Sequence, residues 1–185
     1  AIIANSLNRQ VEDLTITVLD RPRNEELIKR IRKTGARAQV IPDGDLIPGI
    51  LSCLSGSSTH ALMGIGASPE GVISSVGVKI LGGEMQAKFW PRDDADKERL
   101  EDMGIDLQKV YTEEDLAPGK NLALCITAVT SLSTATKHIL DGVSFFGGAA
   151  KTDSLLITNR SLERISTTHI LDRNEFEKSR SEFRL

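Results

Sequence analysis

The sequence predicts an α/β fold in which helices flank a largely parallel sheet. Three times in the first half of the chain, a short apolar run is followed by a turn and a stretch with helical period. Each such crossover helix returns the chain to the same strand direction, which a parallel sheet requires. With 39% hydrophobic and 26% charged residues among 185, the chain has the composition of a globular domain with a buried core.

The first half supplies three strand and helix pairs. Asn24 is a good N-cap for the first helix, and Gly35 is a good stop for it. Asp45 can cap the second helix, and Pro69 suits the first turn of the third. The expected elements are strand 14–19, helix 24–35, strand 36–41, helix 45–54, strand 60–65 and helix 69–80.

The second half is less regular. A glycine pair, Gly147 and Gly148, predicts the turn of a hairpin. The charged residues after Asp172 predict a tail that frays. Because no long linker interrupts the chain, we expect one domain or a piece of one over 1–171, followed by the tail 172–185. The expected elements are helices 93–103 and 112–116, a buried strand 122–129, the hairpin 144–158 and a last strand 165–170.

Composition excludes several classes of function. The formal net charge is −3 and only 4% of the residues are aromatic, so we expect no nucleic-acid partner. The sequence has neither a secretory signal pattern nor an apolar run long enough to span a bilayer, so we expect no membrane association. Two cysteines, Cys53 and Cys125, fit a reducing compartment, and we expect both to be buried by packing. We interpret His60, His138 and His169 as structural, because none has a second ligand at metal-binding spacing.

The turn after the first strand contains Arg21, Pro22 and Arg23. Two guanidinium groups on either side of a rigid proline can hold a phosphate or a carboxylate. The alternative is a surface turn with solvated arginines.

The turn after the second strand contains Asp43, Gly44 and Asp45. Two carboxylates around a glycine can accept hydrogen bonds from sugar hydroxyls or bind a divalent cation. The alternative is a β-turn that ends in a helix N-cap, which explains both acids without a ligand.

The turn after the third strand, 64–71, is rich in glycine and leads into a helix. Such a helix start offers free N–H groups to an anion, and Glu70 lies in its first turn. Glu70 can bind a metal ion, or it can simply complement the helix dipole. The turn is no dinucleotide fingerprint, because Pro69 occupies the place of the third glycine. Since the carboxyl ends of parallel strands share one sheet edge, the three turns together predict a phosphorylated, hydroxyl-rich ligand.

The order and spacing of these blocks closely resemble the class II fructose-1,6-bisphosphatases, including cyanobacterial enzymes that also hydrolyse sedoheptulose 1,7-bisphosphate. The resemblance extends from Val11 to about Thr158 and rests on these segments: 11–14, 19–23, 41–45, 63–71, 81–86, 100–111, 113–116, 142–148 and 154–155.

The resemblance implies a layered sandwich of the sugar-phosphatase superfamily and removal of the C1 phosphate with Mg²⁺ or Mn²⁺ and a metal-activated water. It assigns Glu70 as a metal ligand and leaves the catalytic residues unknown. Ala67 stands where many members have a glycine beside the substrate. The substrate-binding residues that the resemblance implies are Arg21, Pro22, Arg23, Asp43, Gly44, Asp45 and Ala67.

Two departures from the family accompany the resemblance. Members are roughly twice this length, and their amino-terminal half supplies most metal ligands; we therefore expect the isolated chain to be inactive. Residues 126–138 are longer and free of glycine where the family has a compact connection, which favours a tolerated surface insertion. In the full-length protein, we expect a bisphosphatase of gluconeogenesis or the Calvin cycle, located in the cytoplasm or the plastid stroma.

The oligomeric expectation depends on whether the chain is complete. As part of the longer enzyme, we expect a homo-oligomer. If the chain is complete, the alternative function is a non-catalytic, bisphosphatase-derived subunit of a larger assembly, since exposed apolar surface would need a partner subunit.

Overall fold

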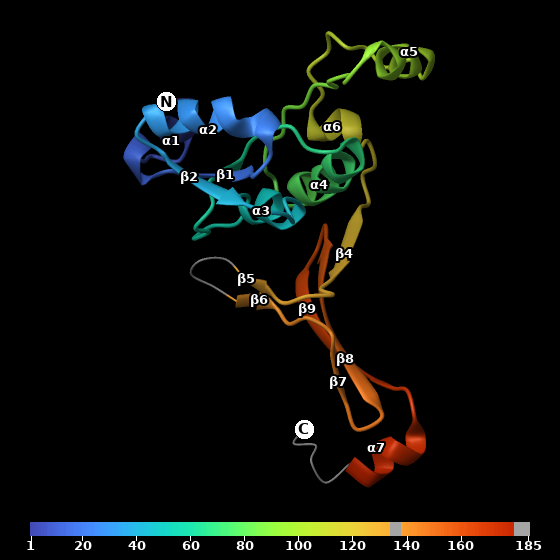
Figure 1. Ribbon diagram of the computed structural model, residues 1–185. Helices are drawn as coiled ribbons and strands as arrows, with labels where there is room; N and C mark the ends of the chain where they lie inside the picture. Colours follow the sequence, from blue (N-terminus) through green and yellow to red (C-terminus); the bar gives the residue numbers. More distant parts are fainter. Residues whose placement is uncertain (134–137, 180–185) are drawn as a thin grey trace. The chain divides into compact units, whose positions relative to one another are not determined.

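The amino-terminal part of the chain forms the parallel sheet that the sequence predicts. In the computed structural model, which describes residues 1–133 and 138–179, β1 (Thr15–Leu19) lies between β2 (Arg37–Ile41) and β3 (Ala61–Leu62) (Figure 1). Both pairings are parallel, with Ile16 opposite Ala38 on one side and Ala61 on the other. The third strand has only two residues, so it is much shorter than the expected 60–65.

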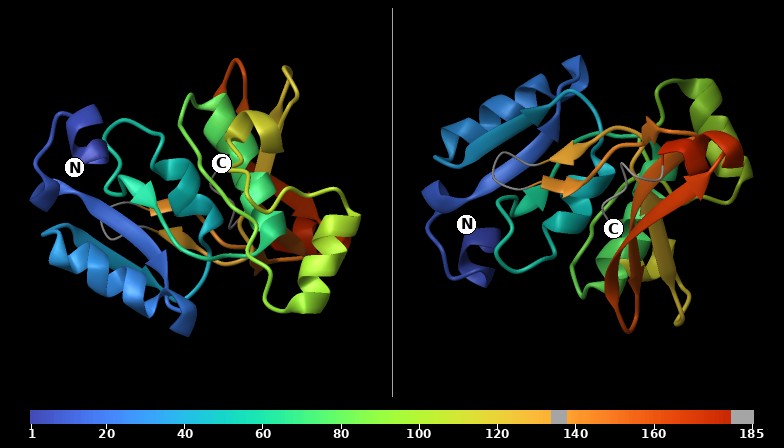
Figure 2. Two further views of the ribbon diagram at one scale, coloured as in Figure 1. Left: turned by 90° about the horizontal axis from the view of Figure 1, so that it is seen from above. Right: turned by 90° about the horizontal axis from the view of Figure 1, so that it is seen from below.

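Helices flank this sheet on two sides. In Figure 1, α1 and α2 lie on one side of β1 and β2, and α3 lies on the other. Both views of Figure 2 show β1 and β2 side by side. Helix α3, expected over 45–54, ends at Leu51. The bounds are α1 (Ile2–Ser6), η1 (Val11–Asp13), η2 (Pro22–Asn24), α2 (Glu25–Lys33), α3 (Leu46–Leu51), α4 (Ser68–Ile80), α5 (Asp94–Asp102) and α6 (Glu113–Leu116).

The core of this part follows from the periodicity of the sequence. All five residues of β1 are buried, as expected for a central strand of a parallel sheet. From α2, Ile28 and Ile31 contribute side chains three residues apart, on one face of the helix. The buried apolar cluster consists of Ala4, Leu14, Ile16, Val18, Ile28, Ile31 and Ala36.

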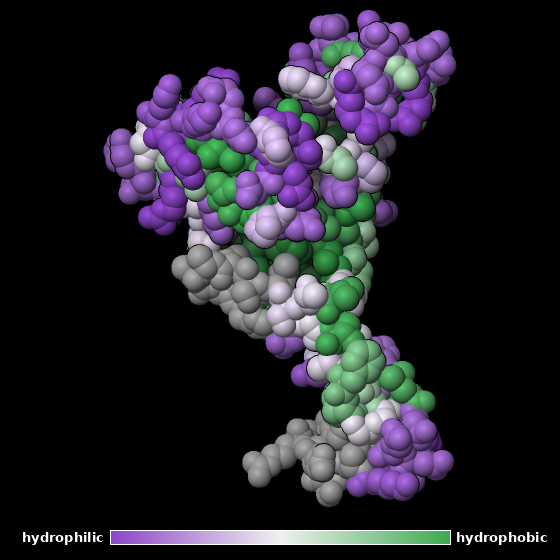
Figure 3. Space-filling model, viewed as in Figure 1, coloured by the Kyte–Doolittle hydropathy of each residue, from purple (hydrophilic) through white to green (hydrophobic). Residues whose placement is uncertain are grey.

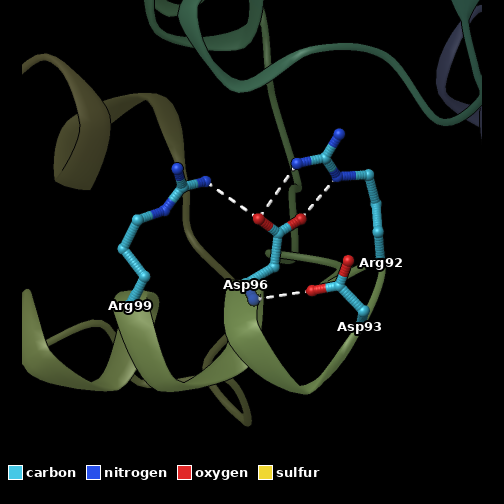
Figure 4. Close-up of polar contacts among 4 residues, drawn as sticks. All are labelled: Arg92, Asp93, Asp96 and Arg99. Carbon is cyan, nitrogen blue, oxygen red and sulfur yellow. Dashed lines mark hydrogen bonds and ion pairs between the residues drawn. The ribbon is translucent and has the colours of Figure 1, made fainter.

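Helix α5 is stabilised by its own charged side chains rather than by burial. The Asp93 side chain caps the helix by accepting a hydrogen bond from the Asp96 amide, 2.8 Å away (Figure 4). The guanidinium groups of Arg92 and Arg99 both bind the Asp96 carboxylate, and the hydrogen bond from Arg92 is the main cause that lowers the pKa of Asp96 to about 2. Figure 3 shows that the surface over this helix is largely hydrophilic.

The carboxy-terminal part is an antiparallel sheet, so the expected parallel arrangement does not extend to it. The strand β8 (Ala149–Thr158) pairs with β4 (Ala123–Thr127), β7 (Ser144–Phe146) and β9 (Leu162–Ile170). The hairpin at Gly147 and Gly148 is confirmed. Strand β4 was expected to be buried, but every second residue is exposed, since only one face is covered. A separate pair joins β5 (Leu132–Ser133) to β6 (His138–Leu140).

The expected fraying after Asp172 is wrong for residues 173–179. These residues form α7 (Arg173–Ser179), and the Asp172 carboxylate accepts hydrogen bonds from the amides of Asn174 and Glu175 at its start. Such bonds satisfy backbone donors that a helix otherwise leaves unpaired.

The chain divides into two compact units, Ala1–Lys120 and Asn121–Leu185. A few exposed residues, 118–121, connect the two units. That residues 1–171 form one domain or a piece of one, followed by the tail, stays a prediction. Among the described residues, no helix is both long and apolar enough to cross a membrane.

Candidate functional site

Three loops follow the carboxyl ends of the parallel strands, and hydrogen bonds join them. We call them the β1 loop (20–24), the β2 loop (42–45) and the β3 loop (63–67). Arg21 Nη1 donates to the carbonyl of Pro42, 2.8 Å away, which joins the β1 loop to the β2 loop. Arg23 Nε donates to the carbonyl of Ile65, also 2.8 Å away, which joins the β1 loop to the β3 loop. The predicted convergence of the three turns is therefore confirmed.

Asn24 has a different role from the one that the sequence predicts. It stands at the N-cap position of α2, but its side chain makes no capping hydrogen bond. Instead, the side-chain nitrogen Nδ2 of Asn24 donates to the Leu19 carbonyl at 3.1 Å. The side-chain oxygen Oδ1 accepts from the backbone amide of Ile65 at 2.9 Å. Only 1% of Asn24 is exposed. The sequence offered one signal for this contact, the glycine at position 64, because a Cβ there would crowd the Asn24 side chain at 3.1 Å.

Gly64 makes that close approach possible. Its φ of +138° is rare for a residue with a side chain, and a Cβ there would lie 3.1 Å from the Asn24 oxygen. The glycine therefore serves the joint between the β1 and β3 loops.

The acidic residues lie around the β2 loop and the start of α4. Burial raises the pKa of Asp45 above its ordinary value, and the negative charges of Glu70 and Asp43 raise it further. A Cβ at Gly66 would lie 3.1 Å from an Asp45 carboxylate oxygen, so the β3 loop passes close to this acid. Asp45 precedes α3 without a capping hydrogen bond from its side chain, so the predicted N-cap role of that side chain is wrong.

Most of the predicted binding residues are open to solvent. Pro22, Arg23, Asp43, Gly44, Ala67 and Glu70 are exposed, while Arg21 and Asp45 are half-buried. Asp43 accepts a hydrogen bond from the Gly44 amide at 2.8 Å, which shapes the β2 loop. Ala67 lies at the N-cap position of α4, where the first N–H groups of the helix begin. The edge thus presents a guanidinium group, carboxylates and a helix start.

The metal that the resemblance implies does not find a complete site in the described residues. Carboxylate oxygens suit Mg²⁺ and Mn²⁺, and the like charges around Asp45 would favour a cation there. However, no group of three or more His, Cys, Asp or Glu side chains in residues 1–133 and 138–179 is arranged to hold a metal ion. We therefore derive no catalytic step through a metal from these residues.

The histidines that the structure describes have structural partners, as expected. His60 Nδ1 accepts from the Thr15 amide at 2.9 Å, and burial lowers the pKa of His60. A hydrogen bond of 2.9 Å joins His169 Nε2 to the Thr152 hydroxyl. The side chain of His138, and residues 134–137 of the segment 126–138, lie outside the described part of the chain.

The prediction of buried cysteines is wrong for one of the two. Cys53 is half-buried after α3, and burial raises the pKa of its thiol. Cys125 is exposed, because it lies on the uncovered face of β4.

The sequence is similar to those of several known proteins. Three curated relatives are named D-fructose 1,6-bisphosphatase class 2/sedoheptulose 1,7-bisphosphatase, the third with the number 2 added. One from Synechococcus sp. (strain JA-3-3Ab) is 38% identical over 92% of this chain and 52% of its own length. One from Microcystis aeruginosa is 37% identical over 95% of this chain and 54% of its own length. One from Acaryochloris marina is 39% identical over 92% and 52%.

The chain thus spans about half the length of the curated relatives that it matches. The family model for "Bacterial fructose-1,6-bisphosphatase, glpX-encoded" matches residues 1–169, a longer stretch than the motifs alone cover. This match includes all three loops and most of the second unit, and on this basis the chain belongs to the glpX-encoded bacterial fructose-1,6-bisphosphatase family.

Proposed function

We propose that this chain supplies the substrate-binding part of a sugar bisphosphatase. In the whole protein, the reaction would remove the C1 phosphate of fructose 1,6-bisphosphate, sedoheptulose 1,7-bisphosphate or both. The observation that carries this proposal is the joining of the β1, β2 and β3 loops through Arg21, Arg23 and Asn24 at one sheet edge. The names of the relatives support the substrate class.

Each loop contributes the chemistry that a phosphorylated sugar needs. Arg23 is exposed and donates to the Ile65 carbonyl through Nε. Its two terminal nitrogen atoms would then make a bidentate contact with a phosphate. Arg21 assists from the same loop. Asp43 and Asp45 would accept hydrogen bonds from sugar hydroxyls, and the backbone at Gly44 and Ala67 allows the sugar to approach. The phosphate bound here is the one that is not hydrolysed.

Glu70 would contribute one carboxylate to a divalent metal site, with Mg²⁺ or Mn²⁺ supplying positive charge to the reacting phosphate. Because the described residues offer no group of three ligands, the remaining ligands would have to come from outside them. We further propose the layered sandwich of the sugar-phosphatase superfamily as the complete fold, and a homo-oligomer as the assembly. We also propose that the protein acts in gluconeogenesis or the Calvin cycle and is located in the cytoplasm or the plastid stroma.

Titration of fructose 1,6-bisphosphate into the chain tests the binding part of the proposal. We expect Arg23→Gln to weaken binding at least about tenfold, because a charge-assisted contact to phosphate is lost. Arg30→Gln is the matched control, since Arg30 is exposed on α2 and outside the loops. Equal affinity of the two variants would contradict the role of Arg23, and no binding by the unmodified chain would contradict the proposed ligand.

Phosphate release by the native protein tests the catalytic part. The protein is isolated from its source, its intact mass is measured, and inorganic phosphate is assayed with Mg²⁺ and with Mn²⁺. A mass near twice 20.1 kDa with metal-dependent release supports the bisphosphatase. A mass near 20.1 kDa without release would instead support a non-catalytic subunit that retains the binding loops.

A further inference from the structure

The backbone N–H and the carbonyl of Ile65 form hydrogen bonds with two consecutive residues of the β1 loop. The Asn24 side chain accepts from the Ile65 amide at 2.9 Å, and Arg23 Nε donates to the Ile65 carbonyl at 2.8 Å. These two contacts join residues that are more than forty positions apart in the sequence. The position of the Arg23 guanidinium therefore depends on the position of Ile65.

Asn24 is the rigid member of this arrangement. It is 1% exposed, and its nitrogen donates to the Leu19 carbonyl at the end of β1. A buried side chain with both polar atoms bonded has one available conformation, whereas an exposed arginine has many. Asn24 thus connects the end of the central strand to the β3 loop, and the β3 loop in turn holds Arg23.

The close contact with Gly64 supports this reading. The glycine adopts φ +138°, and a Cβ there would lie within 3.1 to 3.3 Å of three Asn24 atoms. The β3 loop is therefore shaped around the Asn24 side chain. A side chain needed only to start α2 would have capped that helix, and Asn24 does not.

We propose that Asn24 is a positioning residue for the sugar-bisphosphate site: through Ile65 it fixes the direction of the Arg23 guanidinium. Arg21, whose Nη1 is engaged by the carbonyls of Asp20 and Pro42, fixes the β2 loop in the same way. Because Arg21 holds the β2 loop, Arg23 is the principal phosphate ligand. This inference rests on the proposed function, because it names what prepares Arg23 for the ligand.

The test compares Asn24→Asp with Asn5→Asp in the full chain. The two substitutions make the same chemical change, but Asn5 is exposed on α1 and outside the loops. In Asn24→Asp, the amide nitrogen that donates to Leu19 becomes an oxygen that faces the Leu19 carbonyl. Repulsion between the two oxygens should displace the side chain and so break its contact with the Ile65 amide as well. We expect the dissociation constant for fructose 1,6-bisphosphate to rise about tenfold, at a temperature where both variants are fully folded. Asn5→Asp should match the unmodified chain.

Two NMR signals separate positioning from a purely structural role. The Ile65 amide should exchange faster with solvent in Asn24→Asp, and the Arg23 Nε–H signal, protected in the unmodified chain, should be lost. Inorganic phosphate should shift the Arg23 signal in the unmodified chain and in Asn5→Asp only. If Asn24→Asp does not fold, Asn24→Ser, which keeps a shorter polar group, gives the same readouts.

Several outcomes overturn the inference. It is wrong if Asn24→Asp binds with unchanged affinity, or if the Ile65 and Arg23 signals stay protected. Failure of the proposed function gives a different pattern: the unmodified chain then binds no sugar bisphosphate. In that case the Arg23 signal still decides, because its loss in Asn24→Asp confirms that Asn24 fixes Arg23, and its persistence shows that it does not.

Discussion

The surroundings of Asp45 destabilise the ionised form of its carboxyl group. Burial raises the pKa of Asp45 most, and the charges of Glu70 and Asp43 add to the effect. In Glu70→Gln one of these charges is removed, so we expect the pKa of Asp45 to fall toward its ordinary value of 3.8. An NMR titration of the Asp45 carboxyl carbon measures this pKa.

The control for this titration is Glu26→Gln, because Glu26 is exposed on α2 and away from the β2 loop in the sequence. It should leave the pKa of Asp45 unchanged. If Glu70→Gln also leaves it unchanged, the two carboxylates do not interact, and Glu70 and Asp45 would not share a cation.

At the scale of single residues, the sequence predicted that the three loops meet, but not which hydrogen bonds join them. Arg23, Asp45 and Glu70 were predicted as candidate site residues because charged residues at strand ends are not required by the fold. Asn24 was assigned to a helix cap, since that local role explains an asparagine before a helix. Its contact with Ile65 joins residues far apart in the sequence, so the local pattern that predicts a cap does not reveal it, and only Gly64 hints at a close approach.

The segments that follow α3 and α4 come close together where Gly83 faces Cys53. A Cβ at Gly83 would overlap with the Cys53 sulfur and lie 3.2 Å from a Val78 methyl carbon. We expect Gly83→Ala to lower the free energy of unfolding by about 1–3 kcal/mol through overpacking. Combining it with Cys53→Ala should reduce that cost, because the overlapping atom is gone.

Denaturant unfolding of the two single variants, the double variant and the unmodified chain gives the coupling energy. A cost of Gly83→Ala that is the same with and without the Cys53 side chain would show that the two residues do not touch.

Gly71 offers the opposite case within α4. It lies inside the helix, and a Cβ there would meet nothing within 4 Å. Alanine loses less backbone freedom on folding than glycine, so we expect Gly71→Ala to raise the free energy of unfolding by about 0.5–1 kcal/mol. The same denaturant experiment measures this change, and a loss of stability would mean that the helix start needs the glycine.

Strands β8 and β9 are joined by an ion pair between a buried aspartate, Asp153, and a half-exposed arginine, Arg164. Arg164 Nε donates to the Asp153 carboxylate at 2.8 Å, and this hydrogen bond is the main cause that lowers the pKa of Asp153. Asp153 is 1% exposed. A carboxyl with a lowered pKa in the folded state stabilises the fold above its ordinary pKa, and that contribution is lost as the pH falls.

We therefore expect Asp153→Asn to lower the free energy of unfolding by about 1–3 kcal/mol at neutral pH. The loss should shrink as the pH falls below the ordinary value of 3.8, where the unmodified residue becomes protonated too. Thermal unfolding at several pH values checks this, with Glu163→Gln on the exposed strand β9 as control. A loss that does not change with pH would contradict the role of the ion pair.

For the whole molecule, the sequence predicted the parallel half better than the antiparallel half. Strands 14–19 and 36–41 and the three helices that follow strands were found because burial and helical period repeat regularly there. In the antiparallel sheet, the pairing of β4 with β8 joins residues far apart in the sequence, such as Ala123 and Thr158, and periodicity does not encode such a pairing. In strand β9, apolar and polar residues do not alternate, and the strand is exposed throughout. Only part of it was therefore predicted. The division into two units had no compositional signal at all.

That division leads to a prediction about how the molecule unfolds. Substitutions within one compact unit should change local stability in that unit and leave the other unit's unchanged, since each unit is compact by itself and regions of a protein can open separately. Hydrogen exchange followed by mass spectrometry tests this in mild denaturant. Gly83→Ala should speed exchange in peptides from residues 1–120, and Asp153→Asn in peptides from 121–179. If either substitution speeds exchange equally in both sets of peptides, the chain unfolds as one cooperative structure, and the two units are not energetically separate.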